Sequence, residues 1–195
     1  MQPLGDGALR FVRPEGVPAR VLLARLRAWP RVTDAVVTET HACITFDPAA
    51  PPDDPTLTMA TWTSDAAEAP ARLVTVKARY DGPDLKEVAA KAGLSPDRVA
   101  ELHAAGEYTV AMVGFLPGFA YLHGADARLH VSRRAPRTRV PAGAIGLAAG
   151  YTGVYPFASP GGWSLVASAV DFEPFSPTEG ARLRLGDRVR FERVG

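Results

Sequence analysis

The sequence predicts an α+β protein in which a small α/β domain, residues 1–80, precedes a β-rich, barrel-like domain, residues 81–195. Strand and helix patterns alternate up to about residue 80, two short helices follow at 84–105, and short apolar runs separated by glycine and proline turns begin at Glu107. Many short strands with such turns are typical of barrels. We therefore expect two domains, the second with a helical lead-in.

The expected elements of the first domain follow the order strand, helix, strand, strand, helix, strand. β-Branched runs predict the strands, apolar residues at helical spacing predict the first helix, and a proline-dense break precedes the second helix. Their ranges are 8–13, 18–29, 35–39, 42–46, 54–66 and 73–80. This order is that of a ferredoxin-like unit.

The segment 84–105 has the pattern of two helices separated by a glycine turn. Ser95 suits the N-cap and Pro96 the first helical position of the second helix. A DNA-reading helix-turn-helix has the same outline, but the second helix offers Asp97, Arg98, Glu101 and His103, with acid and base in balance. We therefore expect two packing helices and no nucleic-acid partner.

The last domain contains a strand candidate at Tyr108 to Val113 and a hairpin pattern near its end. In ARLRLGDRVRFERV, apolar residues alternate on both sides of Gly186-Asp187, at positions Leu183, Leu185, Val189 and Phe191. This spacing predicts a β-hairpin with its turn at Gly186-Asp187.

Composition excludes several classes of protein. Twenty-two basic and 21 acidic residues leave a formal net charge of +1, so no global field attracts nucleic acid or an anionic membrane. No apolar run approaches the roughly 20 residues of a membrane span. The start MQPLGDGALRFV lacks the pattern of a signal peptide, and Cys43 has no second cysteine to pair with. We expect a cytoplasmic protein without a membrane partner.

Two segments combine glycine, proline and aromatic residues: GFLPGFAYLHG at 114–124 and TGVYPFASPGGW at 152–163. Glycine permits close approach of a backbone, proline fixes its direction and a ring supplies a stiff wall. The residues predicted to line a groove are Phe115, Pro117, Gly118, Phe119, Tyr121, Tyr155, Pro156, Ser159, Pro160, Gly161, Gly162 and Trp163. The alternative is a barrel whose corners need glycine and whose core needs rings.

The run SRRAPRTRVPAG carries four arginines in a nearly neutral protein. In an extended chain Arg133, Arg137 and Arg139 would share one face and Arg134 would point away. Three guanidinium groups on one face suit a carboxylate or phosphate. The alternative is a set of solvated arginines or ion pairs with the acids Asp126, Asp171 and Glu173.

No catalytic residue can be assigned from spacing. The chain has no GxxxxGK[ST] nucleotide loop and no Ser-His-Asp set, and the spacing of His41, His103, His123 and His130 is not that of metal ligands. We therefore expect no metal site and a chain that supplies part of a site rather than a whole one.

The ordered motifs GFLPGFAYLHG, PRTRVPAG, TGVYP, ASPGGW and LGDRVRF resemble the bacterial family that includes the B subunit of the ATP-dependent 5-oxoprolinase. This family has also been called allophanate hydrolase subunit 1 and sporulation-kinase inhibitor. The similarity covers nearly the whole chain. It implies a small N-terminal α/β domain followed by a cyclophilin-like β-barrel.

The resemblance also implies partners: a C subunit with a related barrel and an A subunit that is a hydrolase. Together they would open the lactam of 5-oxoproline to glutamate at the expense of ATP, with Mg in the assembled complex and neither bound tightly by this chain alone. The arginine face would hold the carboxylate of 5-oxoproline or a phosphate of ATP. This chain would not act autonomously.

Two other functions remain open at this stage. The family name suggests a protein that binds and inhibits a sensor histidine kinase, whose extended segment could occupy the groove. The third class is a subunit of a urea carboxylase or allophanate hydrolase-type enzyme. The chain departs from the family pattern at 167–169, where Ala-Ser-Ala replaces the usual Gly-Arg-Thr. We expect this change to remove a cation and a hydroxyl beside the groove.

Overall fold

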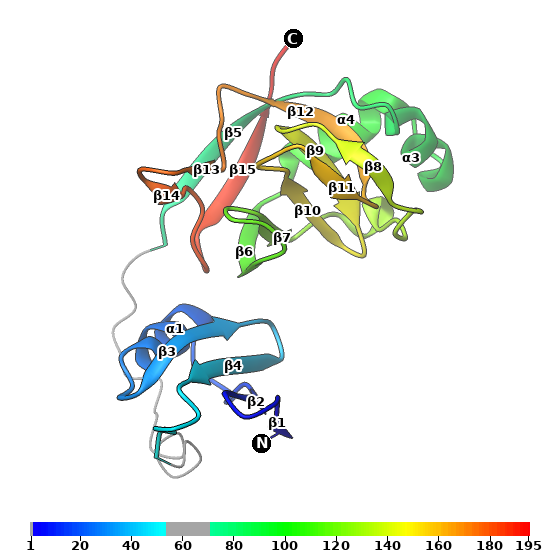
Figure 1. Ribbon diagram of the computed structural model, residues 1–195. Helices are drawn as coiled ribbons and strands as arrows, with labels where there is room; N and C mark the ends of the chain where they lie inside the picture. The colour runs from blue at the N-terminus through cyan, green and yellow to red at the C-terminus, as the bar shows by residue number, and fades with distance from the viewer. Residues whose placement is uncertain (1, 54–70) are drawn as a thin grey trace. The chain divides into compact units, whose positions relative to one another are not determined.

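The computed structural model describes residues 2–53 and 71–195. The chain divides into two compact units, Met1–Pro70 and Ala71–Gly195 (Figure 1). Each unit has its own sheet and its own buried residues. The architecture is the expected mixture of helices and strands.

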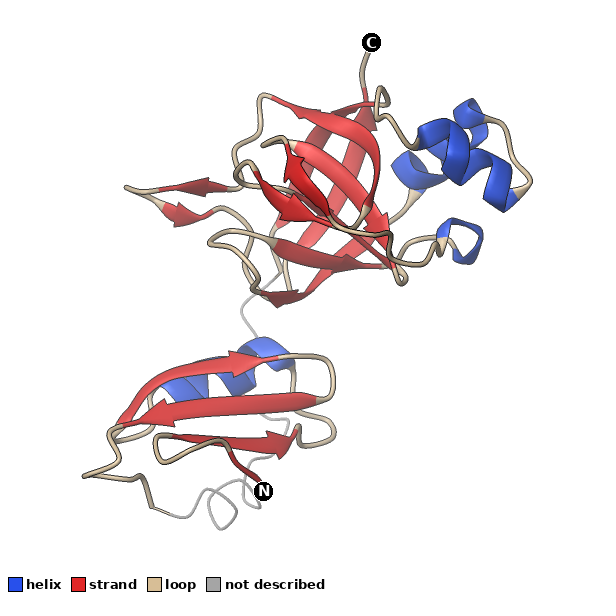
Figure 2. Cartoon of the chain, turned by 45° about the vertical axis from the view of Figure 1, so that its right-hand side comes forward, coloured by secondary structure: helices blue, strands red, loops and turns tan. Residues whose placement is uncertain are grey.

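The N-terminal unit contains a four-stranded antiparallel sheet in the order β1-β2-β4-β3. The helix α1 lies against one face of this sheet (Figure 2). It buries Leu22 and Leu26 completely, next to strands that bury Phe11 and Ile44. The elements are β1 (Gln2–Pro3), β2 (Ala8–Val12), α1 (Ala19–Arg27), β3 (Val32–Val37) and β4 (His41–Phe46).

The fourth strand expected for this unit belongs to the other one. The residues predicted as its last strand form β5 (Leu73–Arg79), which pairs with β12 and β15 in the barrel. The unit boundary therefore falls at Pro70 and Ala71, and not near residue 80. The helix expected at 54–66 lies outside the described residues. Alternation predicts a strand, but it does not predict which strand will be its neighbour.

The two lead-in helices form as the sequence predicts. They are α3 (Leu85–Ala92) and α4 (Pro96–Ala105). Gly93 ends α3 in the left-handed conformation, with φ 65°, and the Ser95 hydroxyl accepts a hydrogen bond from the main-chain N–H of Arg98 at 3.2 Å. Both helices contribute buried residues to the barrel core, so they are packing helices, as expected.

The second unit is built on a closed barrel in the order β10-β7-β6-β15-β5-β12-β9. The pairing of β10 with β9 closes it, and all its strand pairs are antiparallel except β5 with β15. Besides β5, its strands are β6 (Tyr108–Val113), β7 (Ala120–His123), β9 (Ala144–Ala148), β10 (Tyr151–Val154), β12 (Ser164–Val170) and β15 (Arg188–Arg193).

Short elements complete this unit. They are the 3₁₀ helix η1 (Ala127–Leu129), the paired strands β8 (Arg137–Val140) and β11 (Ser159–Gly161), and the paired strands β13 (Phe175–Ser176) and β14 (Gly180–Ala181). The paired strands β8 and β11 bring together the arginine run and the second ring-rich segment, because Ser159 is opposite Val140 and Gly161 is opposite Arg137.

The expected C-terminal hairpin is wrong. The main chain turns at Leu185-Gly186, where the Asp187 N–H donates to the Arg184 carbonyl oxygen at 3.0 Å, but only the second half, β15, is a strand, and it pairs with β5 and β6. The alternating apolar residues are buried as expected, with Leu183, Leu185, Val189 and Phe191 all at most 6% exposed. Their burial follows from the barrel interior rather than from a partner strand in the same segment.

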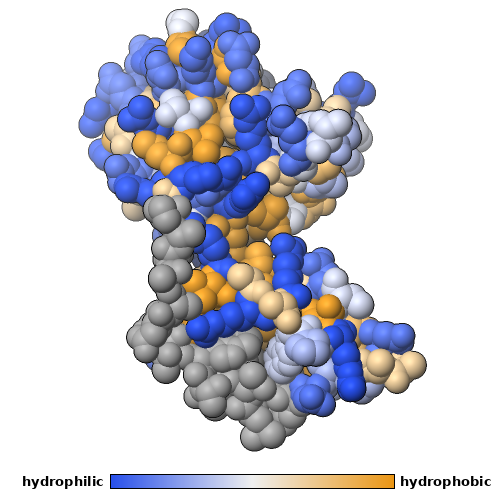
Figure 3. Space-filling view, turned by 90° about the vertical axis from the view of Figure 1, so that its left-hand side faces the viewer, coloured by the Kyte–Doolittle hydropathy of each residue, from blue (hydrophilic) through white to orange (hydrophobic). Residues whose placement is uncertain are grey.

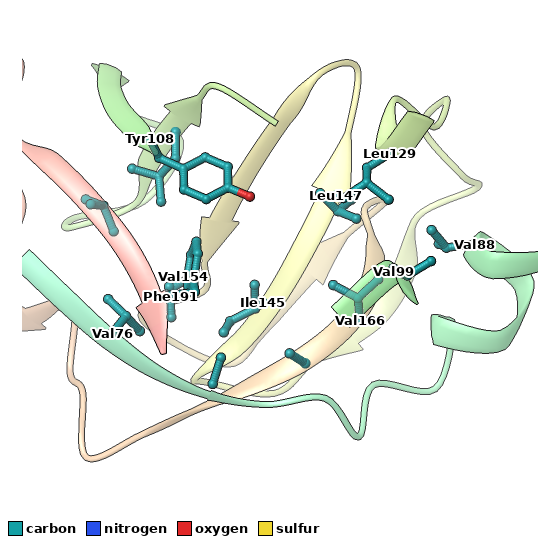
Figure 4. Close-up of a cluster of buried hydrophobic side chains, with 14 of the residues drawn as sticks. Val76, Val88, Val99, Tyr108, Leu129, Ile145, Leu147, Val154, Val166 and Phe191 are labelled. Atoms are coloured by element: carbon teal, nitrogen blue, oxygen red, sulfur yellow. The ribbon is translucent and has the colours of Figure 1, made fainter. Parts of the chain in front are cut away.

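The barrel interior is filled by aliphatic and aromatic side chains (Figure 4). Ile145, Val166 and Phe191 come from three different strands, and Val88 and Val99 come from α3 and α4. The helices therefore pack on the same core as the strands. On the face that Figure 3 shows, hydrophobic side chains also reach the surface of both units among hydrophilic ones.

Candidate functional site

A pocket with a volume of about 290 Å³ lies in the barrel unit. Its walls come from three stretches: the loop from β6 into β7, the segment before β8, and the residues around β10 and β11. The lining residues are Phe115, Phe119, Tyr121, Arg133, Arg134, Pro136, Tyr155, Pro160, Gly161, Gly162 and Trp163. The fold thus brings both ring-rich segments and the arginine run to one hollow.

Four of the groove candidates lie outside this lining: Pro117, Gly118, Pro156 and Ser159. Ser159 is 8% exposed, and its hydroxyl has no hydrogen-bond partner among the described residues. Gly118 lies outside the pocket and permits a close contact between its main chain and the segment at Pro174 and Phe175. With φ 80°, it lies so near Pro174 and Phe175 that a Cβ would meet the Phe175 Cβ at 2.6 Å.

Phe119 is the centre of the aromatic wall. Its ring is 1% exposed and contacts four others edge to face. The centroid distances are 5.0 Å to Tyr121, 5.2 Å to Tyr155, 5.3 Å to Trp163 and 5.5 Å to Phe115. Such edge-to-face pairs add stability beyond area burial. The wall of the pocket is therefore also a small core.

Glycine gives these rings their space. A Cβ on Gly161 would lie 2.5 Å from the Tyr155 hydroxyl, and a Cβ on Gly153 would lie 3.1 Å from the Phe119 ring. Only glycine permits approaches this close. The combination of rings with a bending backbone is thus explained by packing of rings directly against main chain.

Phe115 occupies an unusual position at the edge of the pocket. It adopts φ 76°, a left-handed conformation that is strained for a bulky side chain, and it remains 59% exposed. Its neighbour Gly114 donates a main-chain hydrogen bond to Phe119 at 3.1 Å, which closes the loop between β6 and β7. The loop therefore presents an aromatic side chain to solvent at the rim of the pocket.

The arginines do not form the expected face. Arg133 and Arg134 line the pocket, whereas Arg137 and Arg139 do not. The reason is that residues 132–136 are irregular and the strand begins only at Arg137, so alternation does not extend across the whole run. Arg139 is exposed at the surface.

A buried aspartate explains the position of two arginines. Asp84 is 4% exposed and accepts hydrogen bonds from the Arg137 guanidinium at 2.5 Å and from the main-chain N–H of Leu165 at 2.7 Å. Arg134 lies 3.2 Å from Asp84 and pairs with Glu87 at 2.5 Å. Neither acid is among Asp126, Asp171 and Glu173, the partners that the sequence suggested.

Asp84 and Glu87 are the residues that sequence reasoning missed. Both stand at the start of α3, and the sequence shows them only as acids near the first turn of a helix, where they are common. One signal was present in the sequence: a run of arginines in a nearly neutral protein implies acidic residues elsewhere in the chain. Because Asp84 lies 53 positions from Arg137, the sequence did not show which acid pairs with which arginine.

Tyr155 places a phenol against the pocket wall. The side chain is 1% exposed, and burial raises the pKa of its hydroxyl, while a hydrogen bond with the Trp163 main chain and the charge of Arg133 act in the opposite direction. The Arg137 guanidinium also donates to the main-chain oxygen of Trp163, at 3.3 Å. At neutral pH the phenol keeps its proton and can donate a hydrogen bond.

His103 lies in the barrel core and not in the pocket. Its ring is completely buried, and burial lowers its pKa to about 3. Thr152 donates its hydroxyl proton to the main-chain oxygen of Gly146 at 3.0 Å, so it accepts from His103 Nε2 at 2.9 Å, and Tyr80 donates to Nδ1 at 2.7 Å. The neutral imidazole therefore has a structural role. Among the described residues no group of three or more histidine, cysteine or acidic side chains is placed to hold a metal ion.

The departure at 167–169 lies outside the pocket lining, contrary to expectation. Ala167 is 1% exposed in the barrel core, and the Ser168 hydroxyl donates to Asp81 at 2.6 Å. The three residues belong to β12, where Ser168 is opposite Arg79 of β5. The change therefore affects a strand of the barrel and its pairing with Asp81.

The fold and the site define the second unit as a closed β-barrel with an aromatic pocket, and comparison with known proteins supplies the family. The model of the family described as "Carboxyltransferase domain, subdomain C and D" matches residues 15–181. The chain belongs to this family.

Two relatives are both named as the B subunit of 5-oxoprolinase. The chain is 47% identical over 134 residues to the protein of that name in Escherichia coli O157:H7, and 43% identical over 129 residues to the one in Bacillus subtilis. The matched parts cover 66% and 63% of this chain, and 61% and 53% of the relatives. The chain thus spans less than two thirds of the length of these relatives.

Solved structures share the fold. The protein TTHA0988 superposes with a TM-score of 0.83 at 35% identity, over 96% of this chain and 40% of that one. The Kluyveromyces lactis urea amidolyase has a TM-score of 0.66 at 14% identity, over 90% of this chain and 13% of that one, which shows likeness of fold alone. In the described part of the chain, no helix has the length and hydropathy needed to cross a bilayer.

Proposed function

We propose that this chain is the B subunit of an ATP-dependent 5-oxoprolinase and helps to open the lactam of 5-oxo-L-proline to L-glutamate. The observation that carries the proposal is the 47% identity to a 5-oxoprolinase B subunit over 134 residues. The partners would be a C subunit with a related barrel and an A subunit that is a hydrolase. ATP with Mg would act in the assembled complex.

The pocket supports a role in binding rather than in bond breaking. It offers stiff aromatic walls, the Arg133 guanidinium and the Tyr155 phenol. A lactam carbonyl is a poor electrophile until its oxygen is phosphorylated, so the reaction needs a site that orients the ring and gathers anionic groups. This chain would supply the orientation, and its partners would supply the remaining groups.

The same pocket argues against the kinase-inhibitor alternative. At about 290 Å³ it lies at the small end of the range of ligand pockets, roughly 300–1,000 Å³, and suits a small molecule better than an extended peptide. The likeness to urea amidolyase is one of fold, so it does not favour the urea-degrading alternative.

Two finer points of architecture belong to this proposal. We infer that the N-terminal unit is ferredoxin-like in the order strand, helix, strand, strand of β2, α1, β3 and β4, while the last strand expected for such a unit, β5, belongs to the barrel. We infer that the second unit is a cyclophilin-like barrel, supported by its closed sheet. An experimental structure of the full chain that lacked either topology would refute the corresponding inference.

Reconstitution tests the function. The chain is purified together with the A and C subunits from the same organism, and glutamate release from 5-oxoproline is measured with ATP and Mg, omitting each component in turn. We expect turnover only when all three proteins and ATP are present. Turnover that continues without this chain, or the absence of turnover in the full mixture, would overturn the proposal.

A further inference from the structure

The charges around the pocket leave one cation unbalanced. Arg134 and Arg137 face the two carboxylates of Asp84 and Glu87, so these four groups neutralise each other. Arg133 lines the pocket, and its guanidinium makes no ion pair with any acid in the part of the chain that the structure describes. The positive charge of Arg133 is therefore available to pair with one negative charge of a ligand, and not with several.

The remaining wall is apolar and tight. Phe119 and Trp163 are 1% and 4% exposed, and their ring centroids lie 5.3 Å apart. This part of the pocket therefore offers apolar contacts and no hydrogen-bonding side chain to a ligand. A volume of about 290 Å³ limits the ligand to a compact molecule. A nucleoside triphosphate carries several negative charges and is bound through several cations and a metal, which this wall does not offer.

A second polar group lies on the same wall. The Tyr155 hydroxyl is placed against Gly161, since a Cβ added there would lie 2.5 Å from it, and Gly161 lines the pocket. The Trp163 main chain hydrogen-bonds this phenol, and the charge of Arg133 acts on it as well. The Arg133 guanidinium and the Tyr155 hydroxyl line the same pocket, and both can donate hydrogen bonds. Two such donors are suited to the two oxygens of a carboxylate.

We propose that this pocket binds one carboxylate of a compact molecule with a largely apolar body, held by Arg133 and the Tyr155 hydroxyl, and that nucleotide binds elsewhere in the complex. The inference rests on the proposed function for the identity of that molecule, a five-membered lactam acid. In this proposal the chain binds the lactam acid, and its partner subunits bind ATP.

The test is a binding measurement on the full chain with three probes: 5-oxoproline, 2-pyrrolidinone and ATP with Mg. The second probe is the same ring without the carboxylate. Calorimetry gives the affinity, and the NMR signal of the Trp163 indole N–H reports occupation of the pocket. We expect 5-oxoproline to bind at least about tenfold more tightly than 2-pyrrolidinone, which corresponds to about 1.4 kcal/mol for a charged hydrogen bond. ATP should not shift the Trp163 signal.

Two matched variants locate the carboxylate. Arg133→Gln removes the cation from an exposed side chain, so the fold should persist, and it should weaken 5-oxoproline binding about tenfold while leaving 2-pyrrolidinone unchanged. Arg139→Gln removes an exposed arginine outside the pocket and should leave both affinities unchanged. Equal affinities for the two ring probes, no effect of Arg133→Gln, or a Trp163 shift with ATP would each overturn the inference.

The outcome is separable from that of the proposed function. If the reconstituted complex turns over and Arg133→Gln has no effect on binding, the function holds and the inference fails. If 5-oxoproline binds through Arg133 but no mixture of the three proteins releases glutamate, the pocket assignment holds and the proposed function fails.

Discussion

Asp84→Ala should destabilise the barrel unit more than any other single charge removal near the pocket. The carboxylate is 4% exposed and satisfies two buried donors, the Arg137 guanidinium and the Leu165 N–H. Loss of one partner of a buried ion pair costs about 3–5 kcal/mol, and an unpaired buried N–H costs about 1–3 kcal/mol. Because the Arg137 side chain is 29% exposed and keeps its bond to Trp163, we expect the lower end of both costs, about 4 kcal/mol in total.

The assay is urea unfolding followed by Trp163 fluorescence. Substituting Trp29 and Trp62 by Phe leaves Trp163 as the only tryptophan, so the signal reports the barrel unit alone. Two units in one chain make a single transition an unsafe assumption, and a reporter in one unit avoids it. The midpoint and slope then give the free energy of unfolding of that unit.

Glu87→Ala is the matched control. Its carboxylate also pairs with Arg134, but its side chain is 44% exposed, so we expect a much smaller change than for Asp84→Ala. A loss below about 1 kcal/mol for Asp84→Ala, the size typical of exposed pairs, would refute the argument that burial makes this pair important.

Three further outcomes follow from the packing and the buried histidine. Phe119→Ala removes the ring at the centre of the aromatic wall and should cost about 3–5 kcal/mol by the same urea assay; a loss under about 1 kcal/mol would mean that the wall repacks. Gly161→Ala places a methyl group 2.5 Å from the Tyr155 hydroxyl and should cost about 1–3 kcal/mol and abolish the pocket for 5-oxoproline; unchanged binding in calorimetry would contradict this. His103 stays neutral in the fold, with its pKa lowered to about 3, whereas in the unfolded chain it takes up a proton below about pH 6.5, so its contribution to stability is present above that pH and is lost as the pH falls. Between about pH 6.5 and pH 3 the loss should approach about 1.4 kcal/mol per pH unit relative to His103→Gln, and parallel pH profiles of the two proteins would exclude it.

Local patterns in the sequence determined much of this protein. The Ser95 cap, the Gly93 turn and the alternating residues from Leu183 to Phe191 all behave as expected, because capping, backbone conformation and burial periodicity depend on neighbours within a few positions.

Pairing across the chain was decided only by the tertiary structure. The strand at 73–79, β5, pairs in parallel with β15 and so belongs to the second unit, and Asp84 binds Arg137, which lies 53 positions away in the sequence. A strand's pattern records which face is buried and not which strand lies beside it, and a buried acid is recognised only when its cation has been placed. The arginine run therefore indicated a charged site, while the fold alone determined that Arg133 is the cation that lines the pocket without an acidic partner among the described residues.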